Sequence, residues 1–234
     1  MLVLIPALNE SPTIAQVVAG VKAIGHTPVV IDDGSTDETA AIARMAGATV
    51  LQSSFHLGVG GALRLGLRYA YAQKASLVAQ CDADGQHLPG ELTKLIDAAE
   101  LLQVDLVVGA RRGNSTNLST DPLSRRIAKR LLSAYATRVA HRPLTDTTSG
   151  FRVFRGELIF ELAKNMPNHF LGDTFEVMIV ASRSGYSIAE VEVQMRDREV
   201  GQSRASRYHA FVMTLRVLIS AILRIDYRLQ RKKN

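Results

Sequence analysis

The stretch that decides the expected fold is Ala75-Ser76-Leu77-Val78-Ala79-Gln80-Cys81-Asp82-Ala83-Asp84-Gly85-Gln86-His87. Its apolar first part predicts a buried parallel strand, and its acidic second part predicts a turn at that strand's carboxyl end. Two carboxylates one residue apart supply oxygen ligands for a hard divalent cation, Mg²⁺ or Mn²⁺, with other positions open for phosphate groups. Ligands bind at this edge of open α/β sheets. The alternative is an ordinary turn with solvated acids, because Asp and Gly favour turns.

The bulk composition is that of a globular protein. The chain has 234 residues, 47% hydrophobic and 21% charged, which fits one α/β domain or one domain with a tail. Cys81 is the only cysteine, so no internal disulfide forms and nothing indicates an oxidising compartment. The apolar start at Leu2 is stopped by Pro6 without a basic leader, so no signal peptide is expected.

Positive charge is concentrated at the end of the chain. The net charge is +6, yet residues 198–234 alone hold nine basic and two acidic residues, a net +7. Such a tail suits nucleic acid, a phosphate-bearing substrate or an anionic membrane, or it serves only solubility. Nucleic acid is disfavoured because aromatic and basic residues do not alternate. Residues 205–229 are apolar at helical spacing, but His209, Arg216 and Arg224 interrupt them, which favours an interfacial or packed helix over a spanning one.

Strands and helices alternate along the rest of the chain. Strands are expected at residues 2–5, 28–31, 49–52, 75–79, 106–109 and 189–195, with helices between them. Residues 146–154 are expected to form a polar turn that enters a further short strand. Four strands alternate with helices before Gly109, so the expected architecture is a right-handed parallel sheet. Ser11 is expected to cap the first helix, and Ser35 or Thr36 the second, with Glu38 completing a capping box.

Further polar groups surround the acidic turn, which we define as residues 82–87. Asp32 and Asp33 end the second strand and can accept hydrogen bonds from a base or a ribose, or else serve in capping alone. The glycines at residues 58–61 suit an anion at a helix N-terminus, but they form neither a Walker loop nor a Rossmann fingerprint. Basic side chains cluster on an expected helix over residues 122–140 and in the loop 196–204, which suits phosphate binding. The cluster on the helix is Arg125, Arg126, Lys129 and Arg130.

Seven motifs, in order, resemble one family. Those at residues 5–10, 31–37, 58–62, 82–87 and 109–111 closely resemble the family 2 glycosyltransferases of GT-A fold. Those at 146–152 and 198–204 look like the polyprenyl-phosphate branch, which includes the dolichol-phosphate mannose synthases and undecaprenyl-phosphate sugar transferases. The resemblance implies a Rossmann-like, mostly parallel sheet flanked by helices. It divides the chain into a catalytic domain, 1–204, and a basic amphipathic C-terminal helix and tail, 205–234.

The resemblance also assigns residues to roles. The donor nucleoside is expected at Pro6, Ala7, Asn9, Glu10, Asp32 and Ser35, with Asp82 at its diphosphate. The metal, Mg²⁺ or Mn²⁺, is expected at Asp82, Asp84 and Gln86. The acceptor phosphate is expected at Arg111, Arg125, Arg130, Arg198 and Ser203, and Asp82, Asp84 and Arg198 are the expected catalytic residues. His56, Lys129 and Arg204 depart from the residues usual in the family.

The implied reaction moves a hexose from a UDP- or GDP-sugar to a polyprenyl phosphate. Because that phosphate is already an anion, no strong base is needed, and direct displacement inverts the anomeric centre. The enzyme is expected in the cytoplasm, peripheral on the cytoplasmic membrane face, with a small integral-membrane partner subunit as a further expectation. Asp173 and Glu176 lie where many relatives place a base, so transfer to a sugar hydroxyl stays open. A non-catalytic nucleotide-sugar-binding subunit is the other alternative.

Overall fold

A computed structural model of the protein describes residues 1–111, 123–166 and 173–196. Within them, one seven-stranded sheet has the order β3-β2-β1-β4-β6-β5-β7. The strands are β1 (Leu2–Ala7), β2 (Thr27–Asp32), β3 (Thr49–Gln52), β4 (Leu77–Gln80), β5 (Leu106–Arg111), β6 (Arg152–Arg155) and β7 (Ile188–Val193).

The sheet is mostly parallel, as expected, with one reversed strand. The pairs β1–β2, β1–β4, β2–β3 and β5–β7 are parallel, whereas β6 runs antiparallel to both β4 and β5. The expectation of a parallel sheet therefore holds for every described strand except β6. A short buried strand has the same apolar pattern in either direction, so the sequence pattern left its orientation undetermined.

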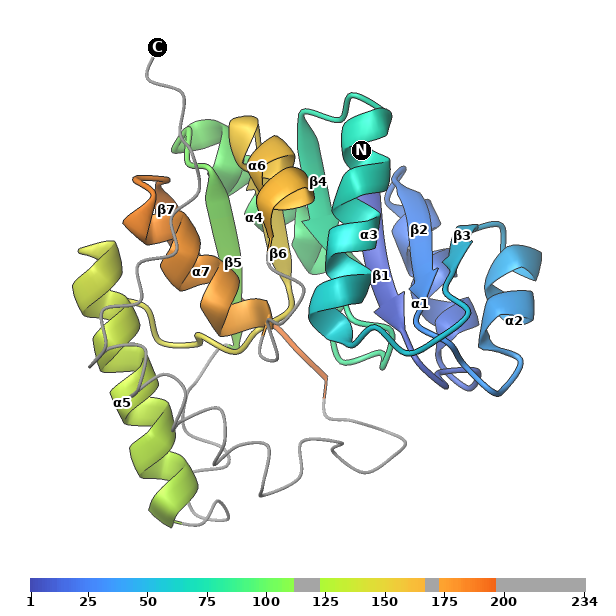
Figure 1. Ribbon diagram of the computed structural model, residues 1–234, viewed down its shortest axis with the longest axis horizontal. Coiled ribbons are helices and arrows are strands. Elements are labelled where there is room, and N and C mark those ends of the chain that lie inside the picture. The colour runs from blue at the N-terminus through green and yellow to red at the C-terminus, as the bar shows by residue number, and fades with distance from the viewer. Residues whose placement is uncertain (112–122, 167–172, 197–234) are drawn as a thin grey trace.

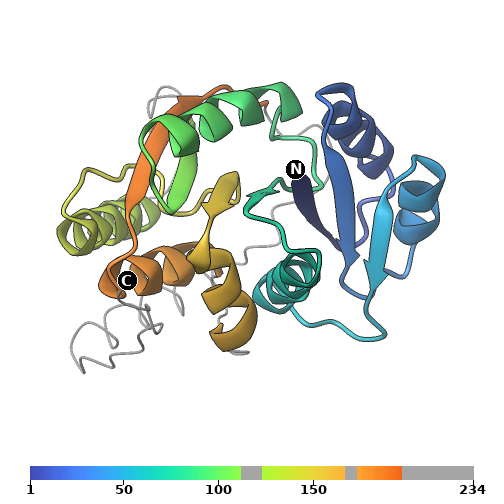
Figure 2. The same ribbon diagram turned by 90° about the horizontal axis from the view of Figure 1, so that it is seen from above.

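Helices cover both faces of the sheet (Figures 1 and 2). They are α1 (Ile14–Ala23), α2 (Thr39–Met45), α3 (Val59–Ala72), the 3₁₀ turn η1 (Pro89–Glu91), α4 (Leu92–Leu101), α5 (Leu123–Ala140), α6 (Glu157–Asn165) and α7 (Asp173–Arg183). One apolar cluster joins the sheet to α3, α5, α6 and α7, and a second joins it to α1, α2 and α4. Each buried strand thus contributes alternate side chains to two cores.

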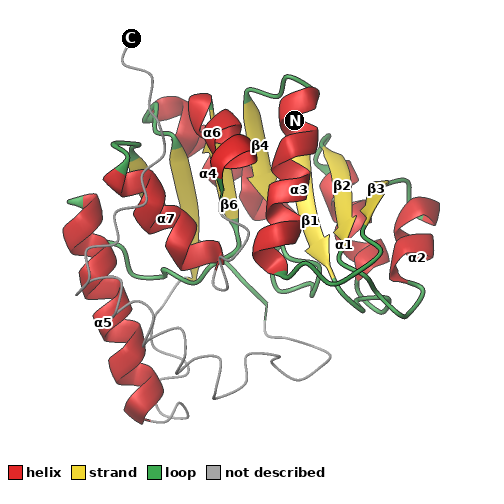
Figure 3. Cartoon of the chain, in the orientation of Figure 1, coloured by secondary structure: helices red, strands yellow, loops and turns green. Residues whose placement is uncertain are grey.

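The chain changes direction across the sheet between β1 and β4. From β1 it builds outward through β2 to β3, then crosses back along α3 to β4 on the other side of β1. The β1–β4 pairing covers only Leu2 to Leu4, although β1 itself continues to Ala7. The two strands therefore separate at their carboxyl ends, which is where open α/β sheets bind ligands. Figure 3 shows the loops at this edge.

The expected helix caps were wrong. Helix α1 begins at Ile14, and its N-cap Thr13 makes no side-chain capping bond. Helix α2 begins at Thr39 and likewise has no side-chain cap. The hydroxyl of Ser35 instead accepts a hydrogen bond from the amide of Asn9, 2.9 Å away. The Ser35 hydroxyl, which the local pattern assigned to capping, therefore bonds to the backbone of a residue distant in the sequence.

No helix in the part of the chain that the structure describes is long and apolar enough to cross a bilayer. The expected C-terminal helix, the domain boundary at residue 204 and the motif at 198–204 lie outside the described residues.

Candidate active site

The acidic turn follows β4 directly at the opening between β1 and β4. Asp82, Asp84, Gly85 and Gln86 are partly exposed, whereas Ala83 and His87 are buried. The three predicted metal ligands are therefore all partly accessible to solvent. Among the described residues no cluster of three or more His, Cys, Asp or Glu side chains forms a closed metal site. Two carboxylates and an amide instead suit an open site that a ligand's oxygens complete.

The backbone of the turn is held by hydrogen bonds within the turn and to two other segments. The amide of Asp82 donates to Nδ1 of His87 at 3.0 Å, and the carbonyl of Ala83 accepts from the Thr13 hydroxyl at 2.7 Å. Oδ1 of Asp84 accepts from the amide of Gln86 at 3.1 Å. The carbonyl of Gln86 accepts from the amide of Arg196 at 2.9 Å. Helix α1, the turn itself and the segment after β7 therefore hold its backbone together.

The carboxylate of Asp82 lies against the backbone of Gly150. A methyl group added at Gly150 would stand 2.8 Å from Oδ2 and 2.9 Å from Cγ of Asp82. Only glycine leaves room for this carboxylate at that position. Sequence reasoning included Gly150 in a motif without assigning it a role, because the contact joins segments 68 positions apart in the chain.

The predicted nucleotide residues meet at the ends of β1 and β2. Ala7 is paired with Asp32 in the sheet register. The amide of Thr36 donates to Oδ1 of Asn9 at 2.7 Å, which adds to the Asn9–Ser35 bond. Oδ1 of Asp32 accepts from the amide of Ser35 at 3.3 Å. Oδ2 of Asp32 is buried and has no hydrogen-bond partner among the described residues.

Pro6 and Glu10 lie on either side of this junction. Pro6 is partly exposed in β1, beyond the last residue that pairs with β4. The amide of Glu10 donates to the Thr39 hydroxyl at 2.8 Å. The structure thus brings all six predicted nucleoside residues to the opening beside the acidic turn.

Asp33 has a structural role in the same region. Its side chain is nearly buried and accepts hydrogen bonds from the amides of Leu57 at 2.6 Å and Gly58 at 3.0 Å. Nδ1 of His56 lies 2.8 Å from its Oδ2. Asp33 therefore fastens the loop before α3 to the end of β2, and the glycine-rich helix start donates to a protein carboxylate.

The predicted acceptor residues are only partly described. Arg111 ends β5 and is half-buried, and Arg130 is exposed on α5. The side chain of Arg125, and Arg198 and Ser203 altogether, lie outside the described residues, so the full set stays a prediction.

Arg152 is a fully buried cation that sequence reasoning left without a role. It pairs with Gln80 in the β4–β6 register, two residues before Asp82. Its Nε donates to the carbonyl of Ser149 at 2.8 Å. The positive charge therefore lies within the sheet, beside the end of β4, where only tertiary pairing could place it.

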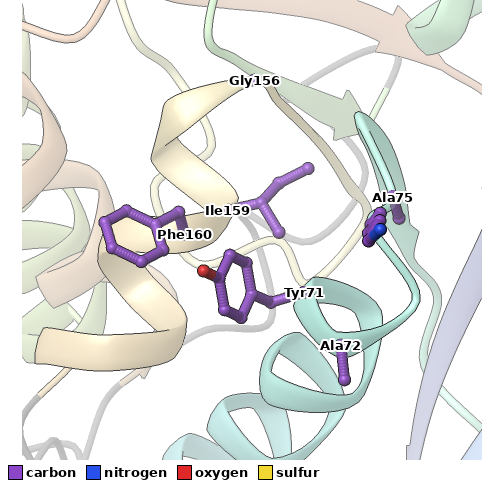
Figure 4. A pocket seen from close by; sticks show the side chains of 7 residues that line it. Tyr71, Ala72, Ala75, Gly156, Ile159 and Phe160 are labelled. Carbon is purple, nitrogen blue, oxygen red and sulfur yellow. The ribbon is translucent and has the colours of Figure 1, made fainter.

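A groove of about 440 Å³ lies at the opposite, amino edge of the sheet (Figure 4). It is formed where α3 ends and α6 begins, by Tyr71, Ala72, Lys74, Ala75, Gly156, Ile159 and Phe160. The rings of Tyr71 and Phe160 lie 5.0 Å apart. None of the predicted site residues lines this groove, so it is not the site described above.

The thiol of Cys81, next to the acidic turn, is buried and has a structural role. Burial, and then the carboxylates of Asp82 and Asp84, raise the pKa of the Cys81 thiol well above its ordinary value. The thiol therefore stays protonated and packs in the core as a small apolar group.

Comparison with known proteins identifies the family. Residues 2–162 match the sequence profile described as glycosyl transferase family 2. The match covers more than half of the chain, and the protein belongs to this family. It is therefore a glycosyltransferase by family, and the predicted family and fold class are confirmed.

Named relatives cover most of the chain. The polyprenol monophosphomannose synthase of Mycolicibacterium smegmatis is 29% identical over 88% of this chain and 80% of its own length. The undecaprenyl-phosphate mannosyltransferase of Micrococcus luteus is 28% identical over 88% of this chain and 87% of its own length. The glucosyl-3-phosphoglycerate synthase of Mycobacterium tuberculosis, solved with Mn²⁺ and UDP, matches with a TM-score of 0.60 at 23% identity, over 95% of this chain and 78% of that one. At that identity the structure establishes the fold alone.

Proposed function

We propose that the protein transfers a hexose from a nucleotide-diphosphate sugar to a polyprenyl phosphate, with inversion at the anomeric carbon. The observation that carries the proposal is the meeting of Asp82 and Asp84 with the Asn9–Ser35 junction at the opening between β1 and β4. The relatives named for polyprenol and undecaprenyl phosphate support the acceptor class. Because a polyprenyl phosphate is a lipid, we propose that the transfer takes place at a membrane surface, on its cytoplasmic face.

The nucleoside would lie over the ends of β1 and β2. The buried Oδ2 of Asp32 is a hydrogen-bond acceptor without a described protein partner, which suits a base or ribose donor. The bonds of Asn9 to Ser35 and Thr36 hold the two loops in place before the ligand arrives. This preorganisation lowers the entropic cost of binding the donor.

The acidic turn fits a divalent cation. Asp82 and Asp84 present carboxylate oxygens, and the Asp82 side chain is 40% exposed, so it remains accessible to a ligand. With Gln86 they would hold Mg²⁺ or Mn²⁺, a pair of ions that this oxygen set does not distinguish. The bound ion would supply charge neutralisation on the departing diphosphate. Gly150 and His87 keep Asp82 in place on the protein side.

The acceptor side relies on positive charge. Arg111 at the end of β5 stands at the same edge of the sheet as the acidic turn, because β1, β4 and β5 all end there. Arginine binds phosphate through paired N–H donors. We propose that Arg111 and Arg130, with Arg125, Arg198 and Ser203, orient the lipid phosphate for attack, and positioning then replaces a strong base. A membrane partner subunit stays a prediction.

The test is product identity. The full chain is incubated with radiolabelled UDP- and GDP-hexoses, Mn²⁺ and undecaprenyl or dolichyl phosphate in detergent. We expect a chloroform-soluble sugar lipid with the wild-type protein, and at least a hundredfold less with Asp84→Ala, as loss of an ion that stabilises transition-state charge predicts. Lys94→Ala is the matched control, because Lys94 is exposed and paired only with Glu91 among the described ion pairs.

Two outcomes would contradict the proposal. A water-soluble or polymeric product would indicate transfer to a sugar hydroxyl. Full activity of Asp84→Ala would show that the acidic turn does not serve the donor diphosphate.

A further inference from the structure

We propose that His87 is a positioning residue that sets the backbone of Asp82 through its ring nitrogen, and so keeps the Asp82 carboxylate in place for a divalent cation. The inference rests on the proposed metal site in the acidic turn, and it assigns to His87 a specific task in that site.

The ring of His87 is fixed by packing. The residue is 5% exposed, and its ring stacks on Phe151 with the centroids 4.7 Å apart and an interplanar angle of 27°. Phe151 is itself fully buried, and its carbonyl accepts from the amide of Gly109 at 2.8 Å. A side chain at Gly109 would approach the Phe151 ring to 2.8 Å, so Phe151 packs closely against the backbone of Gly109. The plane of the imidazole is therefore set by its stacking on a closely packed ring.

The bond to Asp82 replaces a missing strand contact. The amide of Cys81 still donates to the carbonyl of Leu4 at 3.0 Å, as in the β1–β4 ladder. The next residue lies beyond the end of that ladder, and its amide donates to Nδ1 of His87 at 3.0 Å. The bond is partly buried, and an amide left there without an acceptor would be costly, so this bond stabilises the turn.

The geometry also separates the backbone from the carboxylate. Nδ1 of His87 lies 3.7 Å from Oδ2 of Asp82, too far for a hydrogen bond. Since Nδ1 accepts a hydrogen bond from the amide of Asp82, it carries no hydrogen itself, and the ring hydrogen of the neutral imidazole is on Nε2. His87 thus orients Asp82 without occupying either carboxylate oxygen.

The backbone of residue 87 is held from the other side. It forms an antiparallel bridge with Met195, and the neighbouring carbonyl of Gln86 accepts from the amide of Arg196 at 2.9 Å. Both ends of the acidic turn are therefore attached to the sheet region, and the imidazole joins one end to the other.

The test uses three substitutions of His87 in the full chain. Asparagine places an oxygen where Nδ1 stands, so His87→Asn keeps the acceptor. Phenylalanine keeps the stacked ring without an acceptor, and glutamine carries its oxygen one bond farther out. Affinity for Mn²⁺ alone is measured by the electron paramagnetic resonance signal of the free ion, and folding by thermal unfolding.

We expect His87→Phe and His87→Gln to weaken Mn²⁺ binding by about tenfold, as loss of an outer-shell partner does. His87→Asn should stay within about threefold of wild type. In sugar transfer, the apparent KM for Mn²⁺ should rise in the first two variants, while kcat at saturating Mn²⁺ changes less. A general loss of folding would instead lower kcat and leave the apparent KM for Mn²⁺ unchanged.

Asp84→Ala separates the two hypotheses. If the wild-type protein does not bind Mn²⁺, or if Asp84→Ala binds it as well, the proposed metal site fails and the role of His87 fails with it. If Asp84→Ala loses binding but His87→Phe binds like wild type, only the inference about His87 is refuted. Equal weakening in the Asn and Phe variants also refutes it.

Discussion

The contact between Gly150 and Asp82 makes the proposed site sensitive to one methyl group. In Gly150→Ala the new Cβ would stand 2.8 Å from Oδ2 and 2.9 Å from Cγ of Asp82, and closer still to Oδ1. Carbon atoms ordinarily keep about 3.5 Å from such neighbours, so the carboxylate must move by roughly 0.5–1 Å. Gly150 has no positive φ, so its backbone accepts alanine without strain.

We expect a large effect on activity and a small effect on stability. A misplacement of about 1 Å can cost about a hundredfold in rate, and we expect kcat/KM to fall by about 10–100-fold. The Asp82 side chain is 40% exposed and can rotate toward solvent, so the free energy of unfolding should change by less than about 1 kcal/mol. Transfer assays at several Mn²⁺ concentrations and urea denaturation measure the two quantities.

Gly90 provides a control for the substitution at Gly150. Gly90→Ala is a matched change, because nothing lies within 4 Å of the added methyl and its φ is not positive, so it should leave activity unchanged. If Gly150 acts through Asp82, Gly150→Ala should have no further effect on Mn²⁺ affinity in an Asp82→Ala background. Additive effects in the double variant, or wild-type activity of Gly150→Ala, would refute the reasoning.

Two further predictions concern the loops beside the site. Asp33→Ala removes the acceptor of two backbone amides in the loop before α3, and we expect a loss of about 1–3 kcal/mol in the free energy of unfolding by urea denaturation; unchanged stability would show that water replaces the carboxylate. For Asp37, slight burial raises the pKa, but hydrogen bonds from Thr39 and Ser11 outweigh it and hold the pKa below the ordinary 3.8. Because the folded pKa is the lower one, the stabilisation is present above pH 3.8 and is lost as the pH falls through the folded value. Asp37→Asn should therefore flatten the acid limb of a pH–stability curve, and an identical limb in both proteins would contradict this.

The sequence by itself determined the elements and the chemistry of the acidic turn. Alternating apolar and polar segments predicted six of the seven strands within a few residues of their observed bounds, because burial imposes a local period on each strand. The motifs from Asn9 to Gln86 also predicted which side chains would gather, since the carboxyl ends of parallel strands meet at one edge. The family match confirmed the fold and the class of transferase.

Only the tertiary structure decided the direction of β6 and the contacts that this direction creates. Antiparallel pairing places Arg152 beside Gln80 and brings Gly150 against Asp82. The ring of Phe151 then stacks under His87. The hydroxyl of Ser35 does not cap a helix but accepts a hydrogen bond from the amide of Asn9, 26 positions away. The direction of β6 and these contacts depend on groups that are far apart in the chain. A local sequence pattern carries no information about which distant partner satisfies a buried polar group.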